Sequence, residues 1–219
     1  MNDIAVVYRN LADEIKKSVY QRCYDPDRGL IADSPEKNTF SQHANVLAIL
    51  TNTFPETADK IQIINKLLND KELAQCTLYF SFYLFEALEK VGQANRFTSS
   101  LTPWKQMLDA GLTTFAEIPG NARSDCHAWS ASPVYYFLSL VSGIKPASPG
   151  FESVRIEPNP GSLKNIDATM PHKLGAIHVK LQKDKDHLSG EITLPMHLDG
   201  VFIWNGVQRP LQGGINKID

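Results

Sequence analysis

Residues 110–133 read AGLTTFAEIPGNARSDCHAWSASP, and this stretch separates two segments of helical character. Gly111 follows the first segment, where a glycine supplies the left-handed residue that closes a helix. A loop rich in Pro, Gly, Asn and Ser comes next. Ser132 and Pro133 then favour the cap and first position of a second helix. The loop between the two helices carries Glu117, Asp125, His127 and Trp129. A loop anchored by two rigid helices is a suitable place for catalytic groups.

Helical periodicity also marks the chain on both sides of this loop. Apolar residues recur at helical spacing, and capping residues precede several of the segments. A turn is expected at Tyr24–Gly29, followed by a short extended piece at Leu30–Asp33. The predicted helices are 3–22, 41–50 with Ser41 as cap, one capped by Thr57, 77–91, 94–110 with Pro103 near a kink or start, and 133–142.

The segment 77–91 differs from the other predicted helices. Its aromatic residues surround the helix instead of forming one stripe, and such a helix is buried on all sides. About six helices with short connections, one of them buried, indicate antiparallel helical hairpins packed in layers.

The hydrophobic period changes to two beyond Lys145–Gly150. Ile177, Val179 and Leu181 alternate with polar residues, as expected for strands with one buried face. Asn205-Gly206 is a strong signal for a two-residue hairpin. The sequence therefore predicts an α+β chain of two domains, with a helical domain at 1–145 and a small antiparallel β domain, a sheet or sandwich, at 146–219.

Composition narrows the possible functions. The 219 residues carry a formal net charge of −2, which gives no electrostatic footprint for nucleic acid. No apolar run is long enough for a transmembrane helix, and the N-terminus lacks the pattern of a signal peptide, so we expect a soluble protein. The three cysteines form no CxxC pair, and the histidines lack metal-ligand spacing. We therefore expect no metal site.

The loop also carries a resemblance to a known family. TTFAE at 113–117 and CHAWSASP at 126–133 resemble motifs in the C-terminal part of bacterial α-L-rhamnosidases, glycoside hydrolase family 78. SQHANVLA at 41–48 and YFSFY at 79–83 extend the resemblance. One departure is Ala116, where many relatives carry Trp. The resemblance implies the C-terminal half of an (α/α)6 barrel of the six-hairpin glycosidase type, followed by the β domain.

The resemblance also implies a reaction and roles for three residues. The family hydrolyses terminal α-L-rhamnosyl residues with inversion and needs no cofactor or metal. Glu117 matches the family's general base, and His127 and Trp129 match positions that line the sugar subsite. A carbohydrate is therefore the expected ligand, with no nucleic acid and no membrane as partners.

Each of these assignments has a simpler structural alternative. Glu117 could be a solvated loop glutamate, His127 could join loop and helix, and Trp129 could be packing near a helix start. Asp125 could orient His127 or cap a turn. Gln42, His43 and Asn45 could face the mouth of the barrel, or they could serve local capping and interhelical hydrogen bonds. Glu152 and Glu157 are expected to be surface charges of the β domain.

The family's general acid lies in an Asp- and Arg-rich segment that has no match here, since Asp25-Pro26-Asp27-Arg28 is typical of a turn. We therefore expect the chain to hold the general base without the acid and to be inactive alone. A half barrel would also leave apolar helix faces open, with 78–88 most in need of cover. We therefore expect either a homodimer through that open face or a repacking of the helices. The alternative function is a non-catalytic carbohydrate-binding or scaffolding module.

Overall fold

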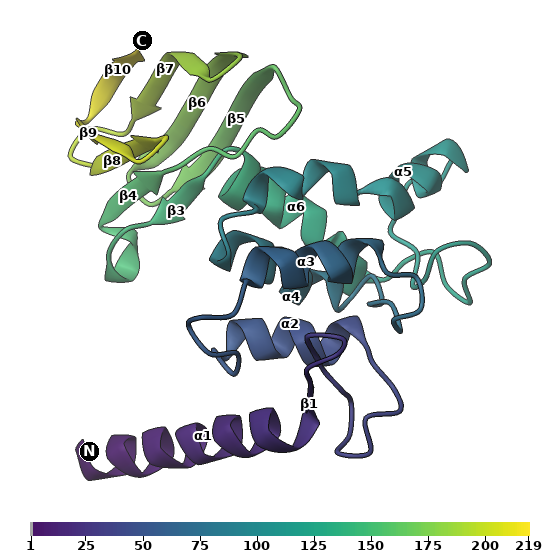
Figure 1. Cartoon of the computed structure of the whole chain (residues 1–219). Coiled ribbons are helices and arrows are strands. Elements are labelled where there is room, and N and C mark those ends of the chain that lie inside the picture. The colour runs from purple at the N-terminus through teal and green to yellow at the C-terminus, as the bar shows by residue number, and fades with distance from the viewer. Residues whose placement is uncertain (1) are drawn as a thin grey trace. The chain divides into compact units, whose positions relative to one another are not determined.

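The computed structural model describes residues 2–219 (Figure 1). The chain forms two compact units, which meet at the peptide bond between Gln93 and Ala94. This boundary lies earlier than the change from helices to strands near Pro146. Among residues 2–219, no helix combines the length and the apolar character that are needed to cross a membrane.

The first unit is built mainly from helices. Its elements are α1 (Asn2–Cys23), β1 (Tyr24–Asp25), β2 (Leu30–Ile31), α2 (Gln42–Leu50), α3 (Lys60–Asn69) and α4 (Ser81–Lys90). The predicted first helix and the turn after it are confirmed, because Asp25 Oδ1 accepts hydrogen bonds from the backbone N–H groups of Asp27 and Arg28. The two short strands pair antiparallel across this turn.

Side-chain caps set where two of these helices begin. Ser41 caps α2 as predicted, since its hydroxyl accepts a hydrogen bond from Ala44 N. The prediction of Thr57 as the next cap is wrong. Asp59 takes this role in α3, accepting a 2.9 Å hydrogen bond from Gln62 N. Both residue types are good caps, and only the backbone path decides between them.

The polar residues at the start of α2 serve the interior of the first unit. Asn45 is fully buried and donates to the carbonyls of Ile31 and Ser41, while its Oδ1 accepts from Ile31 N. Gln42 acts in the same way, because its Nε2 donates to Leu67 O and its Oε1 accepts from Cys76 N. These contacts satisfy backbone groups that would otherwise be buried without partners. The local structural role is thus the one observed for both side chains.

Helix α4 lies deep in the first unit. It begins at Ser81, later than expected, and buries Leu84, Phe85, Ala87 and Leu88. Tyr79, just before the helix, is 47% exposed. The aromatic residues therefore divide between the core and the rim, because the helix presents side chains in all directions.

The second unit opens with a broken helical region. The single helix predicted for 94–110 is wrong. The segment forms two 3₁₀ turns, η1 (Ala94–Arg96) and η2 (Thr98–Ser100), before α5 (Thr102–Asp109). Pro103 stands in the first turn of α5, where its missing N–H is not needed.

The helix after the central loop is also less regular than predicted. It is assembled from a 3₁₀ turn η3 (Ala128–Ala131), α6 (Ser132–Tyr136) and a π-helical turn η4 (Phe137–Val141). Ser132 is not the cap that the sequence suggested, because the N-cap position of α6 is Ala131 and makes no side-chain cap hydrogen bond. Pro133 still lies in the first turn.

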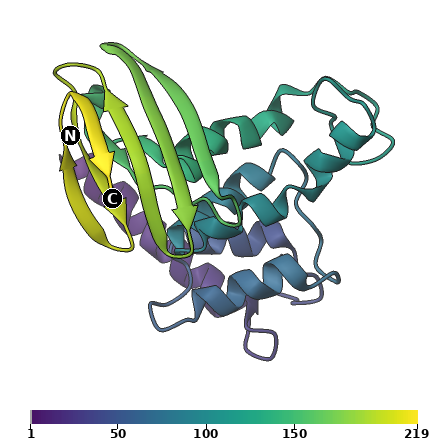
Figure 2. The ribbon, with the colours of Figure 1, turned by 90° about the horizontal axis from the view of Figure 1, so that it is seen from above.

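Strands occupy the rest of the second unit. They are β3 (Ile144–Pro146), β4 (Ser153–Ile156), β5 (Asn165–His172), β6 (Gly175–Asp184), β7 (His187–Leu194), β8 (Asp199–Trp204), β9 (Val207–Leu211) and β10 (Gly214–Ile218), with a short helical turn η5 (Pro149–Phe151) before β4. One sheet has the order β10-β7-β6-β5, and its strands lie side by side, green to yellow, in Figure 2. The other has the order β3-β4-β8-β9.

The sheets confirm the period of two and correct one pairing. Ile177, Val179 and Leu181 of β6 are buried while their neighbours face outward. The hairpin at Asn205-Gly206 joins β8 to β9 antiparallel, with positive φ angles of 50° and 78°. The purely antiparallel arrangement is wrong, because β4 pairs with β8 in parallel. The chain reaches β8 only after forming β5, β6 and β7 of the other sheet, and such a long connection permits parallel pairing.

Candidate functional site

The candidate site lies on the loop between α5 and η3. Gly111 ends α5 with a φ of 78°, and Leu112 N donates to Met107 O, which closes the last turn of the helix. Two further backbone hydrogen bonds fold the loop back on itself, from His127 N to Phe115 O at 2.7 Å and from Glu117 N to Ser124 O at 2.9 Å. Glu117 and His127 are thereby placed on neighbouring segments of the same loop.

Side chains tie the two segments together as well. The Thr114 hydroxyl donates to the carbonyl of Asp125, and the hydroxyl of Ser124 accepts from Cys126 N at 3.3 Å. Ser124 therefore supplies the side-chain oxygen of this turn. The part of Asp125 that holds the loop is its backbone carbonyl.

Glu117 is held by a two-pronged ion pair with Arg123. Arg123 Nε donates to Glu117 Oε2 at 2.9 Å, and Arg123 Nη2 donates to Glu117 Oε1 at 2.6 Å. The Glu117 side chain is 19% exposed, whereas that of Arg123 is 77% exposed. Such a fork matches the two carboxylate oxygens and fixes their orientation. The carboxylate is therefore positioned from the solvent side.

The ion pair also sets the charge of the carboxyl group. The hydrogen bonds from Arg123 lower the pKa of Glu117, against a smaller raising effect of burial, and the positive charge of Arg123 lowers it further. Ionised partners favour the charged form of a carboxylate. Glu117 is consequently a carboxylate at neutral pH, which suits a base and not a proton donor.

His127 and Trp129 lie next to this carboxylate. His127 Nε2 is 3.8 Å from Glu117 Oε1, and the rings of His127 and Trp129 are 4.9 Å apart at an angle of 41°. His127 is mostly buried and its Nδ1 atom lacks a hydrogen-bond partner among residues 2–219, whereas Trp129 is 49% exposed. The three residues singled out in the sequence are thus brought together. They form a row from a charged group to an open aromatic face.

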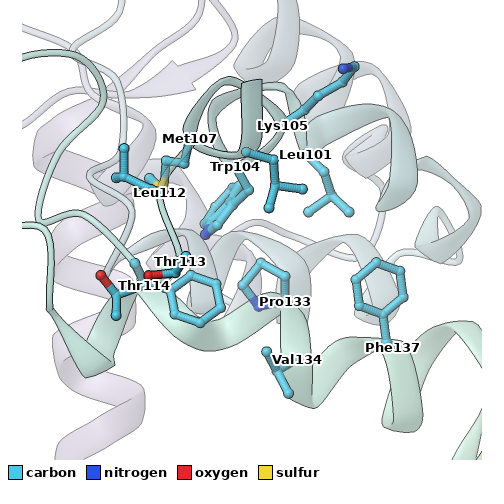
Figure 3. A pocket seen from close by; sticks show the side chains of 12 residues that line it. Leu101, Trp104, Lys105, Met107, Leu112, Thr113, Thr114, Pro133, Val134 and Phe137 are labelled. Carbon is cyan, nitrogen blue, oxygen red and sulfur yellow. The ribbon is translucent and has the colours of Figure 1, made fainter. Parts of the chain in front are cut away.

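An apolar hollow of about 400 Å³ adjoins the loop (Figure 3). Trp104 and Met107 of α5 line one side, and Pro133, Val134 and Phe137 line the other. The indole N–H of Trp104 donates to Ser130 O at 2.7 Å, so the ring is anchored to η3, just ahead of α6. This contact links the two helices that carry the loop.

Two parts of the site were missed from the sequence. Arg123 has no motif of its own, and only its distance of six residues from Glu117 across a turn-rich segment could have suggested the pair. The hollow is the second part. The apolar spacing of Leu101, Trp104 and Met107 indicates a helix face, but it does not indicate which segment lies opposite that face. In the portion of the chain that the structure covers, no group of three His, Cys, Asp or Glu residues could hold a metal ion.

Comparison with known proteins identifies a family that this chain resembles. Residues 143–200 match the family described as bacterial alpha-L-rhamnosidase C-terminal domain. The chain resembles the C-terminal part of bacterial α-L-rhamnosidases. The match begins at Gly143 and so covers β3 to the start of β8. No curated protein matches the chain.

Solved rhamnosidase structures share its fold. The family 78 rhamnosidase of Bacillus sp. GL1 has a TM-score of 0.72 and 24% identity, covering 80% of this chain and 20% of its own. The Streptomyces avermitilis α-L-rhamnosidase, solved in complex with L-rhamnose, has a TM-score of 0.74 and 20% identity, covering 96% of this chain and 24% of its own. The chain therefore spans about a fifth to a quarter of the length of these enzymes.

Proposed function

We propose that this chain is the C-terminal portion of an inverting glycoside hydrolase of the α-L-rhamnosidase type, in which Glu117 is the general base. The observation that carries the proposal is an ionised, largely buried carboxylate beside His127 and the open ring of Trp129. The similarity to rhamnosidases over β3 to β8 and the shared fold support it. The substrate would be a terminal α-L-rhamnosyl residue of a glycan or glycoside.

The chemistry asks for two carboxyl groups across the scissile bond. In an inverting enzyme one protonates the leaving oxygen and the other activates water, with about 6.5–9.5 Å between them. Glu117 suits the second role because its pKa is lowered and it stays ionised. His127, whose Nε2 lies near Oε1 of Glu117, would donate a hydrogen bond to a sugar hydroxyl. Trp129 would cover an apolar face of the sugar.

The proton donor would come from a segment that this chain does not contain. The family's acid segment has no counterpart in the sequence, and we propose that the chain alone is inactive for this reason. We further propose that residues 1–145 correspond to half of an (α/α)6 barrel and residues 146–219 to the β domain that follows it. The similarity to one quarter of longer enzymes supports this division of the parent protein.

A chimaera tests the proposal directly. In it, this chain replaces the matching C-terminal segment of the Bacillus sp. GL1 rhamnosidase, and hydrolysis of an aryl α-L-rhamnoside is measured. The isolated chain should show no hydrolysis. In an active chimaera, Glu117→Gln should lower kcat by about 10²–10⁴, the usual contribution of a general base. Turnover of Glu117→Gln at the level of the parent chimaera would refute the assignment.

Glu157→Gln is the matched control for that experiment. Glu157 is also a carboxylate paired with an arginine, Arg155, but it lies at the end of β4. Its replacement should leave kcat unchanged. An equal loss in both variants would mean that the ion pairs act through stability and not through catalysis.

One observation favours the second candidate, a non-catalytic carbohydrate-binding module. Arg123 takes one acceptor site on each oxygen of Glu117 and lowers its pKa, which weakens the carboxylate as a base for water. A module of this kind would bind L-rhamnose in the isolated chain, and Trp129→Ala would abolish binding. A folded chimaera that binds the sugar without any turnover would favour this candidate.

A further inference from the structure

His127 and Ser130 each bury a polar atom that the contacts of the central loop leave unused. Ser130 is fully buried, and neither its Oγ atom nor Nδ1 of His127 has a hydrogen-bond partner among residues 2–219. Buried polar atoms in folded proteins are almost always hydrogen-bonded. Because this chain itself encloses both atoms, their partner has to be a neighbouring group of the same fold or a small enclosed molecule.

The backbone places the two side chains on one face of the turn η3. Ser130 N donates to His127 O at 3.1 Å, with His127 at the N-cap position of this 3₁₀ turn. In a 3₁₀ turn the side chains of residues i and i+3 eclipse each other. Both residues are also held from outside the turn, since His127 N donates to Phe115 O and Trp104 Nε1 donates to Ser130 O, each at 2.7 Å. The turn therefore brings the hydroxyl of Ser130 to the side of the His127 ring.

The other ring nitrogen of His127 lies near a negative charge. Nε2 is 3.8 Å from Oε1 of Glu117, and hydrogen bonds from Arg123 lower the pKa of Glu117, which keeps it ionised. A proton on Nε2 is attracted to that carboxylate, whereas a lone pair on Nε2 would be repelled. In a neutral imidazole that carries its proton on Nε2, the Nδ1 atom is an acceptor and needs a donor. A serine hydroxyl is a source of such a donor.

We propose that Ser130 is a positioning residue that holds His127 in the tautomer with its proton on Nε2. The two side chains make no direct hydrogen bond, so the link is one enclosed water that accepts from the hydroxyl and donates to Nδ1. The hydrogen bond at one ring nitrogen of a histidine decides whether the other nitrogen carries the proton. Ser130 thereby sets the role of a nitrogen that it does not touch.

This tautomer gives the site a hydrogen-bond donor beside Glu117. In the proposed function His127 donates a hydrogen bond to a sugar hydroxyl, and a neutral ring can do so from Nε2 only in this tautomer. The connection to sugar binding rests on the proposed function. The tautomer itself is a property of this chain alone, so the two can be tested separately.

Nitrogen-15 NMR of the chain with labelled histidine rings tests the tautomer. His127→Gln identifies the His127 resonances, because they disappear in that variant. At mildly alkaline pH, where an imidazole is neutral, Nε2 should show the pyrrole-type shift of a protonated nitrogen and Nδ1 the pyridine-type shift of an acceptor. A pyrrole-type shift for Nδ1 would overturn the proposal, and this measurement requires no change at Ser130.

Ser130→Ala tests the source of the donor. Loss of the hydroxyl should move the Nδ1 resonance toward that of an imidazole nitrogen without a hydrogen bond, and Ser130→Thr should restore it because threonine keeps the hydroxyl. Ser132→Ala is the matched control. Ser132 Oγ is also buried without a partner among residues 2–219, but residues two apart do not share a helical face. An unchanged Nδ1 resonance in Ser130→Ala, or an equal change in Ser132→Ala, would overturn the assignment.

Kinetics separate this proposal from the proposed function. In an active chimaera, Ser130→Ala should raise KM for the aryl α-L-rhamnoside about 2–10-fold, the usual contribution of one hydrogen bond, and should change kcat less. A Ser130→Ala variant with an altered Nδ1 resonance and an unchanged KM would refute the role of His127 in sugar binding. The same result would support the link between Ser130 and the tautomer.

Discussion

Arg123 donates a hydrogen bond to each carboxylate oxygen of Glu117, at 2.9 and 2.6 Å. The arginine is exposed and the glutamate is not, so the charge of the site is controlled from the surface of the loop. A water activated by Glu117 would bind through the second lone pair of one of these oxygens, next to the guanidinium charge that lowers the pKa of the carboxyl group. The pair therefore links the position of a surface arginine to the reactivity of the carboxylate.

Replacing Arg123 should change the titration of Glu117. The ion pair lowers the pKa of Glu117, so Arg123→Ala should raise it toward the ordinary value of 4.5. Arg123→Lys should have an intermediate effect, because lysine keeps the charge without the fork. Carbon-13 NMR of the glutamate carboxyl groups across a pH series measures this. Unchanged titration of Glu117 in Arg123→Ala would contradict the contact.

The same pair makes stability depend on pH in a defined direction. Because the pKa of Glu117 is lower in the folded state, its stabilising effect is present above the unfolded pKa and is lost as the pH falls through the folded pKa. The unfolding free energies of the native chain and Arg123→Ala should therefore converge in acid. Urea unfolding at neutral and acidic pH measures the difference, which should be small because the pair is partly exposed.

Trp104 should be important for the stability of the second unit. Its buried ring joins α5 to the start of α6, and its N–H donates to Ser130 O. Trp104→Ala should lower the free energy of unfolding by about 3–5 kcal/mol. Leu108→Ala on the same helix is the control, because Leu108 is 73% exposed and its loss should change the unfolding free energy by less than about 0.5 kcal/mol. Urea unfolding followed by circular dichroism compares them, and equal effects would contradict the anchoring role.

Gly143 should tolerate no side chain. Its φ is 71°, and a Cβ atom there would lie 2.1 Å from the carbonyl carbon of Glu157. Gly111 has a similar φ of 78° but nothing within 4 Å of the same position. Gly111→Ala should therefore cost about 1–2 kcal/mol from backbone conformation alone. Gly143→Ala should cost more than about 3 kcal/mol, because backbone atoms must also move. Thermal unfolding distinguishes them, and equal losses would refute the close approach.

The cysteines should differ sharply in reactivity. Burial raises the pKa of Cys76 to about 12, whereas Cys126 is exposed on the central loop. The thiolate is the reactive form, so a thiol reagent at mildly alkaline pH should modify Cys126 rapidly and Cys76 only on unfolding. Mass spectrometry after short labelling identifies the modified residue. Early modification of Cys76 in the folded chain would show that its surroundings open easily.

Much of the architecture could be predicted because it depends on nearby residues. The first helix, the Ser41 cap and the hairpin at Asn205-Gly206 follow from periodicity, hydrogen-bonding side chains and backbone preferences that act over a few positions. The choice of Asp59 over Thr57 could not be predicted in this way. Thr57 and Asp59 are both suitable capping residues, and only the path of the backbone decides which of them caps α3.

The sequence by itself determined that Glu117, His127 and Trp129 fall in one short stretch between two helices, since glycine and proline mark its ends. Only the tertiary structure decided that Arg123 closes on Glu117 and that β4 pairs with β8 in parallel. It also decided that α4 is largely buried while apolar residues of α1 such as Ile4 and Leu11 are exposed. These features depend on which segments meet in space, and the meeting of distant segments is set by the packing of the whole core and not by any local pattern.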